Sequence, residues 1–213
     1  MTALPQPPLA PPRDWSFPVP ERARLSNGIE TRVYRLPGQH VIAAHLILDV
    51  PLSVEDRAHE GVATICARTL DEGTRTHPGE EFAELLETEG AGFGIDASLS
   101  GLQAFLDVPA SHLDRALQLF AEAVVEPDQA DPDVRRQMAL RLAEIDQARA
   151  NSSQLAGIAF RAAIFDPNSR AAREFGSKTA ARKAMPARGE ELARACSTSA
   201  SRNATWRRTS GSA

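Results

Sequence analysis

The order of strand-like and helix-like segments is the feature that most restricts the fold of this chain. Apolar residues recur at every second position in strands and at every third or fourth position in helices, and this spacing changes several times along the chain. The spacing predicts strands over Ile29–Leu36, Val41–Val50, Phe93–Leu99 and Gly101–Val108, and helices over Glu60–Leu70, His77–Gly90, Ser111–Glu126, Asp131–Ala150 and Ser152–Phe165. Because the strands come in adjacent pairs, they predict an antiparallel or mixed sheet packed against helices, which is an α+β fold.

The two ends of the chain differ in composition from this periodic part. Residues 1–23 are rich in proline, which fixes φ and removes a backbone donor, so we expect an extended N-terminal arm. Residues 24–180 are expected to form the α+β domain. Residues 181–213 are rich in Ala, Ser, Thr and Arg and contain little that could form a core, so we expect a disordered basic tail.

Composition restricts the class of protein. Hydrophobic residues make up 42% of the chain and charged residues 24%, as in soluble globular proteins. The net charge of -4 gives no general attraction to nucleic acid or to an anionic membrane, and the basic tail lacks the interleaved aromatic residues of a nucleic-acid module. The sequence has no apolar run of membrane-spanning length, and its first residues lack the pattern of a secretory signal, so we expect a cytoplasmic protein.

The most informative segment is Gly61–Thr74, GVATICARTLDEGT, in which an apolar helical run ends in an acidic pair and Gly-Thr. One landmark precedes this segment, which is Leu25–Ile29 with the sequence LSNGI. The landmarks that follow it, in chain order, are Gly90-Ala91, Asp96-Ala97-Ser98, Val108-Pro109 and Arg141–Ile145. With these landmarks, about Leu25–Lys178 resembles an N-terminal-type half-domain of the insulinase/pitrilysin family of zinc metallopeptidases, the inverted zincins. The resemblance implies the α+β fold of that half-domain.

The resemblance also locates the positions where active members carry an HxxEH zinc motif. The two histidines fall at Thr64 and Arg68, and the general base falls at Ala67. A distal glutamate ligand is retained at Glu144, whereas a second acidic position is Gln137. One carboxylate cannot hold catalytic zinc, so we expect no catalytic residues and no cofactor, although active relatives bind zinc.

Two interpretations of Arg68 and Glu144 are open at this point. If the fold holds, the arginine and the glutamate approach each other, and an ion pair stands where the metal stood. Alternatively, Arg68 reaches solvent and Glu144 lies on a wet face of its helix. The remaining histidines (His40, His45, His59, His77 and His112) are scattered and are interpreted as surface or packed residues.

The leading functional hypothesis is a noncatalytic subunit or half-domain that pairs with an active insulinase-family homologue and contacts peptide through a sheet edge. An active zinc metalloendopeptidase with unorthodox ligands is the first alternative. The second is a truncated or frameshifted fragment, because the family's half-domain normally continues beyond Gly176-Ser177 into further strands. The domain would then be incomplete at its C-terminus.

Overall fold

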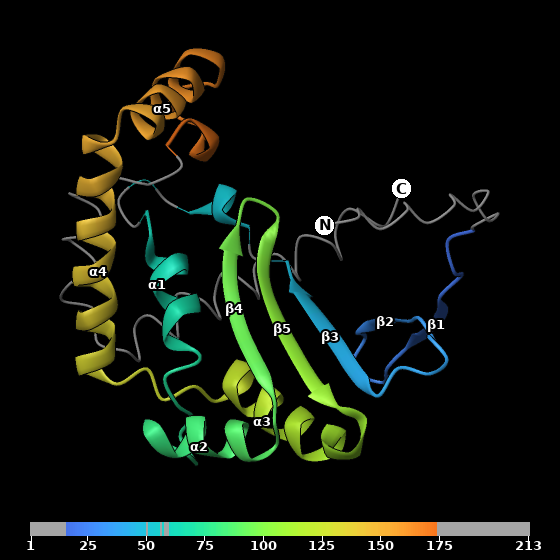
Figure 1. The fold of residues 1–213 in the computed structure, drawn as a ribbon. Helices are drawn as coiled ribbons and strands as arrows, with labels where there is room; N and C mark the ends of the chain where they lie inside the picture. Colours follow the sequence, from blue (N-terminus) through green and yellow to red (C-terminus); the bar gives the residue numbers. More distant parts are fainter. Residues whose placement is uncertain (1–15, 50, 56, 58–59, 174–213) are drawn as a thin grey trace, which may run out of the picture. The chain divides into compact units, whose positions relative to one another are not determined.

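The computed structural model describes residues 16–49, 51–55, 57 and 60–173 (Figure 1). Contacts divide the chain into two units, Met1–Gln39 and His40–Ala213, and each is described by itself. Residues 1–15 of the predicted arm and the whole predicted tail, 181–213, lie outside the described residues.

The described part of the first unit contains a β-hairpin. Strand β1 (Glu21–Arg24) pairs antiparallel with β2 (Glu30–Val33). The turn between them uses Gly28 at a φ of 90°, where glycine is favoured, and the Asn27 side chain accepts a hydrogen bond from the Ile29 amide at 3.1 Å. The strand β2 is shorter than the predicted strand, and β1 begins inside the range expected for the arm.

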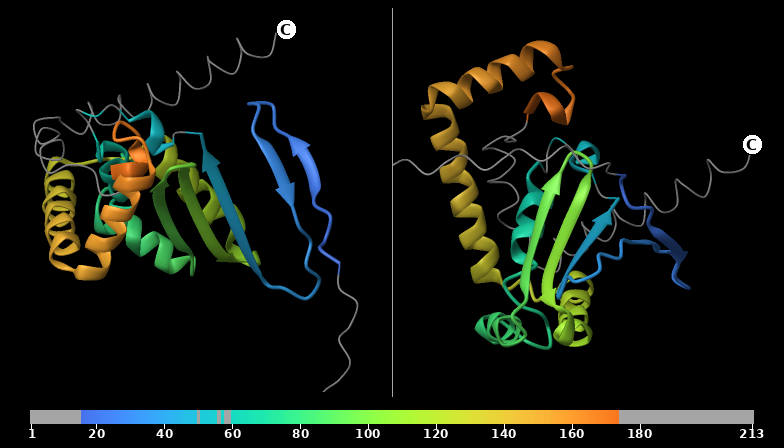
Figure 2. Two further views of the ribbon diagram at one scale, coloured as in Figure 1. Left: turned by 90° about the horizontal axis from the view of Figure 1, so that it is seen from above. Right: turned by 45° about the vertical axis from the view of Figure 1, so that its right-hand side comes forward.

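The second unit contains an antiparallel sheet of three strands. Strands β3 (Val41–Leu48), β4 (Gly92–Ser98) and β5 (Gly101–Pro109) lie in the order β3-β5-β4. Strands β4 and β5 form a hairpin, whereas the chain between β3 and β4 passes through helices (Figures 1 and 2). The predicted α+β fold with an antiparallel sheet packed against helices is confirmed.

Three of the described helices, α1 (Val62–Thr69), α2 (Glu80–Thr88) and α3 (Leu113–Val125), pack on the sheet. The helix α4 (Asp131–Ala150) packs against α1 and is followed by α5 (Ser152–Ile164). Short 3-10 segments lie at Leu52–Val54, Ala110–His112 and Arg170–Arg173. The main core forms where Leu106 and Val108 of β5 pack against Ala116 and Phe120 of α3. A second cluster joins Phe82 of α2 to α3. The alternating burial along β5 explains the period-two pattern in the sequence.

Two helix starts differ from the prediction. The helix α2 begins at Glu80 rather than at His77-Pro78, because Pro78 forms an antiparallel bridge with Gly73. The helix α3 begins at Leu113, after the 3-10 segment that contains Ser111, and its N-cap residue His112 makes no side-chain capping hydrogen bond.

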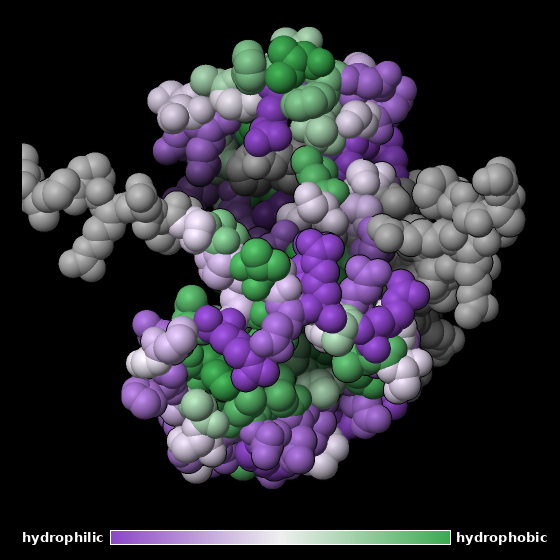
Figure 3. Space-filling view, turned by 90° about the vertical axis from the view of Figure 1, so that its right-hand side faces the viewer, coloured by the Kyte–Doolittle hydropathy of each residue, from purple (hydrophilic) through white to green (hydrophobic). Residues whose placement is uncertain are grey.

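Helix α5 lies at the far end of α4 and has no buried residue. Its Leu155, Phe160 and Ile164 side chains are exposed, and Figure 3 shows hydrophobic surface at the top, at the height of α5 in Figure 1. Within the described residues, no helix combines the length and the apolar character needed to cross a membrane.

Candidate functional site at the contact of α1 and α4

The helix α1 carries three of the positions that the sequence singled out, and its first turn is held by a glutamate. Glu55 Oε1 accepts hydrogen bonds from the backbone amides of Ala63 at 2.9 Å and Gly61 at 3.2 Å. These amides belong to the helix N-terminus, where backbone donors lack intrahelical partners and an anion is favoured. Gly61 has a φ of 100°, so the chain enters the helix through a turn that favours glycine.

The position of the expected general base is part of the core. Ala67 is 2% exposed and packs against Leu102 of β5, with Leu48, Ile95 and Ala97 beside them. Thr64 is also buried. A methyl group cannot take a proton from water, and a threonine hydroxyl is a poor substitute for an imidazole as a zinc ligand.

Arg68 and Glu144 form an ion pair between α1 and α4. Arg68 Nη1 donates to Glu144 Oε1 at 2.7 Å, although the two residues are 76 positions apart in sequence. The pairing that the sequence left open is therefore confirmed. Zinc does not fit this arrangement, because a permanent guanidinium cation takes up the carboxylate that would be a ligand.

A second arginine joins this pair from α4 itself. Arg141 Nη1 donates to Glu144 Oε2 at 3.1 Å, so that each oxygen of the carboxylate accepts from a different arginine. Burial acts to raise the pKa of Glu144, but the hydrogen bonds and charges of Arg68 and Arg141 together outweigh it and lower the pKa below its ordinary value. The carboxylate therefore remains ionised well below neutral pH.

Gln137 lies two turns before Glu144 on α4, and its side chain forms a hydrogen bond with a residue that follows α1. Its Nε2 donates to Glu72 Oε1 at 2.8 Å, and Arg136 pairs with the same glutamate at 2.5 Å. The position where the resemblance places an acidic residue thus holds an amide that binds a carboxylate from the other side of the contact.

The histidines that the structure describes are dispersed over the second unit. His45 stacks on Phe105, His77 Nδ1 lies 2.9 Å from Glu122 Oε2, and His112 Nδ1 lies 2.7 Å from Glu89 Oε2. Among the residues that the structure describes, no three His, Cys, Asp or Glu side chains are grouped so that they could hold a metal ion. His59 lies outside the described residues.

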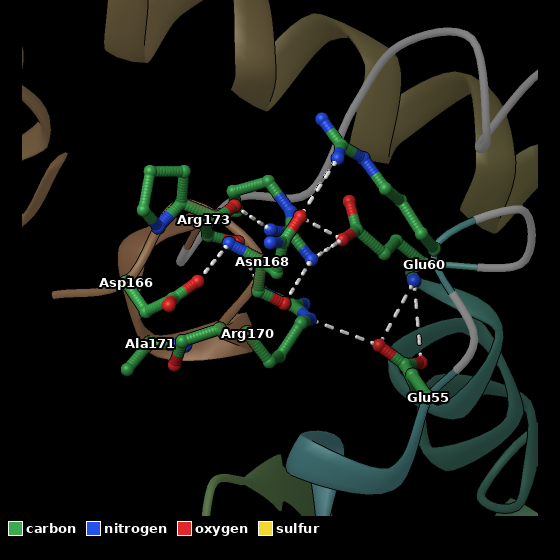
Figure 4. A network of polar contacts seen from close by, with 11 residues as sticks. Glu55, Glu60, Asp166, Asn168, Arg170, Ala171 and Arg173 are labelled. Atoms are coloured by element: carbon green, nitrogen blue, oxygen red, sulfur yellow. Dashed lines mark hydrogen bonds and ion pairs between the residues drawn. The ribbon is translucent and has the colours of Figure 1, made fainter.

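A second set of ion pairs, which no pattern in the sequence indicated, lies at the N-terminus of α1 (Figure 4). Arg170 Nε donates to Glu55 Oε2 at 3.0 Å, and Arg173 pairs with Glu60. The side chains of Glu55, Glu60 and Arg170 are almost completely buried. We call these four residues the clasp, because they fasten the segment after α5 to the start of α1. Their sequence separations of 115 and 113 residues explain why no local pattern revealed them.

The fold and the contact of α1 with α4 thus define an α+β half-domain in which an ion pair joins two positions where the resemblance places zinc ligands. Residues 35–172 match the family model described as insulinase, peptidase family M16. The chain belongs to the insulinase family.

Relatives of the chain include proteins described as peptidases and as a non-peptidase. It is 24% identical over 143 residues to a protein of Rickettsia bellii described as an uncharacterized zinc protease, covering 67% of this chain and 35% of the relative. It is 25% identical over 131 residues to the non-peptidase homolog YmxG of Helicobacter pylori, covering 62% of this chain and 30% of the relative. The chain therefore spans about a third of the length of these relatives.

The fold is also that of solved structures. An inactive peptidase M16 domain from Pseudomonas fluorescens superposes with a TM-score of 0.73 at 22% identity, covering 81% of this chain and 42% of that chain. A protease from Helicobacter pylori superposes with a TM-score of 0.57 at 20% identity, covering 64% of this chain and 33% of that chain. At these sequence identities, the similarity to the two solved structures shows the fold alone.

Proposed function

We propose that this chain is a noncatalytic half of an insulinase-family assembly. The observation that carries the proposal is the Arg68–Glu144 ion pair, because a permanent cation contacts the carboxylate that is expected at the distal zinc-ligand position. Thr64 and Ala67 complete the argument, since neither supplies a ligand or a base at the positions of the motif. The description of one relative as a non-peptidase and of one solved neighbour as inactive supports the same function.

The proposed partner is an active insulinase-family homologue, and the proposed ligand is an extended peptide. The strand β4 is an edge strand, because it pairs only with β5 among the described strands. The Ala97 amide on β4 donates to the Asp96 side chain at 2.9 Å instead of to β5, which indicates that it faces the open edge. Such an edge can add a peptide as a further strand through backbone hydrogen bonds. The compartment proposed for this pair is the cytoplasm, on the grounds of the sequence alone.

Metal and peptidase measurements test the noncatalytic role. We expect the purified chain to contain zinc far below one equivalent and to leave extended peptides uncut, with or without a chelator. Mixing it with an active homologue should give a complex by size-exclusion chromatography. Stoichiometric zinc together with chelator-sensitive cleavage by the chain alone would instead establish the alternative, an active enzyme with unorthodox ligands.

A peptide without basic side chains tests the sheet edge separately. We expect a neutral, extended peptide to bind, and the same peptide N-methylated at alternate amides to lose binding, because methylation removes the donors that pair with a strand. Equal binding of the two peptides would refute edge addition. The fragment hypothesis stays a prediction, which is tested by reading the alternate frame of the gene downstream of codon 180 for resumption of the family pattern.

A further inference from the structure

The face of the sheet opposite the helices has an ordered arrangement of side chains. Antiparallel register places directly opposed residues on the same face, so the strands supply three rows. The rows are Ala43, Asp107 and Gly92; then His45, Phe105 and Gly94; then Ile47, Gln103 and Asp96. The alternate residues, among them Leu106 and Val108, form the core on the helix-covered face.

The middle row contains an aromatic ring that is covered on only one side. The Phe105 ring stacks on His45 of β3, with ring centroids 4.5 Å apart and an interplanar angle of 16°. On its other side the neighbour is Gly94 of β4, which has no side chain. Because side chains in a strand stand roughly perpendicular to the sheet, the second face of the ring is left open toward β4. Phe105 is accordingly 40% exposed.

Backbone geometry does not require a glycine at position 94. Gly94 is not among the residues with positive φ, and a Cβ built on it would meet no atom within 4 Å. Glycine also weakens a strand, because it loses much conformational freedom and packs nothing. The missing side chain at position 94 therefore keeps the ring of Phe105 accessible.

Two carboxylates lie on either side of this open ring. Asp107 is two residues from Phe105 along β5, and Asp96 is two residues from Gly94 along β4, so both belong to the rows adjacent to the ring. Both aspartates are exposed. Asp96 Oδ1 accepts from the Ala97 amide, which fixes this side chain beside the strand.

We propose that this face is a binding site for the guanidinium group of an arginine side chain on a peptide. A planar cation stacks on the open face of an aromatic ring, and two carboxylates can accept its N–H donors at the same time. Arginine fits better than lysine, because its planar group can stack and donate in several directions within its plane. The acidic character of the site excludes phosphate-bearing ligands. The site rests on the sheet alone, and it requires neither the partner nor the edge addition proposed above.

The test compares two ligands of nearly the same shape on the full chain by two-dimensional NMR of backbone amides. N-acetyl-arginine N-methylamide should shift the Gly94 and Phe105 signals. The citrulline counterpart replaces the cation with a neutral urea group, and it should bind about tenfold more weakly, the size expected for loss of a cation–π contact with charge-assisted hydrogen bonds. Equal shifts and affinities for both ligands, or no shift with the arginine ligand, would overturn the site.

Protein variants locate the site. Gly94→Val should abolish the arginine shifts, because its side chain fills the space beside the ring, and Asp107→Asn should weaken binding about threefold, as for a single exposed charge contact. The matched control is Gly157→Ala in α5, where a Cβ also meets no atom within 4 Å, and it should bind like the unchanged chain. Binding that survives both Gly94→Val and Asp107→Asn would refute the proposal. Neutral-peptide binding at the edge is a separate measurement, so either proposal can fail while the other stands.

Discussion

The Arg68–Glu144 ion pair allows a quantitative test of how much one charge pair stabilises the contact of α1 with α4. The perturbation is a double-mutant cycle of Arg68→Ala, Glu144→Ala and the double variant, measured by urea unfolding monitored by circular dichroism. The cycle isolates the coupling between the two side chains from the packing that each loses separately.

The magnitude follows from the distance and the exposure of the two groups. Two unit charges about 4 Å apart interact by about 1 kcal/mol in bulk water and about 4 kcal/mol at an effective dielectric constant of about 20. The Arg68 side chain is 32% exposed and the Glu144 side chain 39% exposed, so water screens the pair and the lower part of that range applies. Arg141 also remains on the carboxylate when Arg68 is removed. We therefore expect a coupling free energy of about 1 kcal/mol, equal to about 2–4 °C in Tm for a chain of this size.

The coupling should depend on pH in one direction. Because the pKa of Glu144 is lower in the folded state than the ordinary value of 4.5, the pair contributes its stability above that ordinary value and loses it as pH falls through the lowered pKa. The coupling should also decrease with added salt. Additive effects of the two substitutions at neutral pH and low salt would refute the conclusion that this ion pair stabilises the contact.

Two further substitutions test the same half of the molecule by unfolding measurements. Arg173→Ala should lower the free energy of unfolding by about 3–5 kcal/mol, because it leaves the buried Glu60 carboxylate without its ion-pair partner. This loss should exceed that of Arg68→Ala. A smaller loss than that of Arg68→Ala would contradict the stabilising role given to the clasp. Gly73→Ala should destabilise by about 2 kcal/mol or more, because Gly73 has a φ of 143° and a Cβ there would lie 2.4 Å from the Gly79 backbone nitrogen; unchanged stability would show that this bridge relaxes freely.

Local patterns were enough to predict most of the elements. The strands β3, β4 and β5 and the helices α3, α4 and α5 lie close to their predicted ranges, because spacing of two or of three to four residues records which side of an element is buried. The resemblance to the family also places the positions of the zinc motif at Thr64, Ala67 and Arg68 from the sequence alone, and this placement stays a prediction. The start of α2 could not be predicted, because the Gly73–Pro78 bridge that displaces it is a backbone contact without a residue signature.

The sequence by itself determined the order of the elements that follow β1, the α+β class and the absence of a histidine and base pattern on α1. Only the tertiary structure decided which charged side chains form ion pairs. It brought Arg68 onto Glu144 across 76 residues, added Arg141, and joined Glu60 to Arg173. It also set the register that leaves one face of Phe105 open beside Gly94. Periodicity is a property of neighbouring residues along one element, whereas ion pairs and cross-strand neighbours depend on the packing of several elements at once, which no single stretch of sequence records.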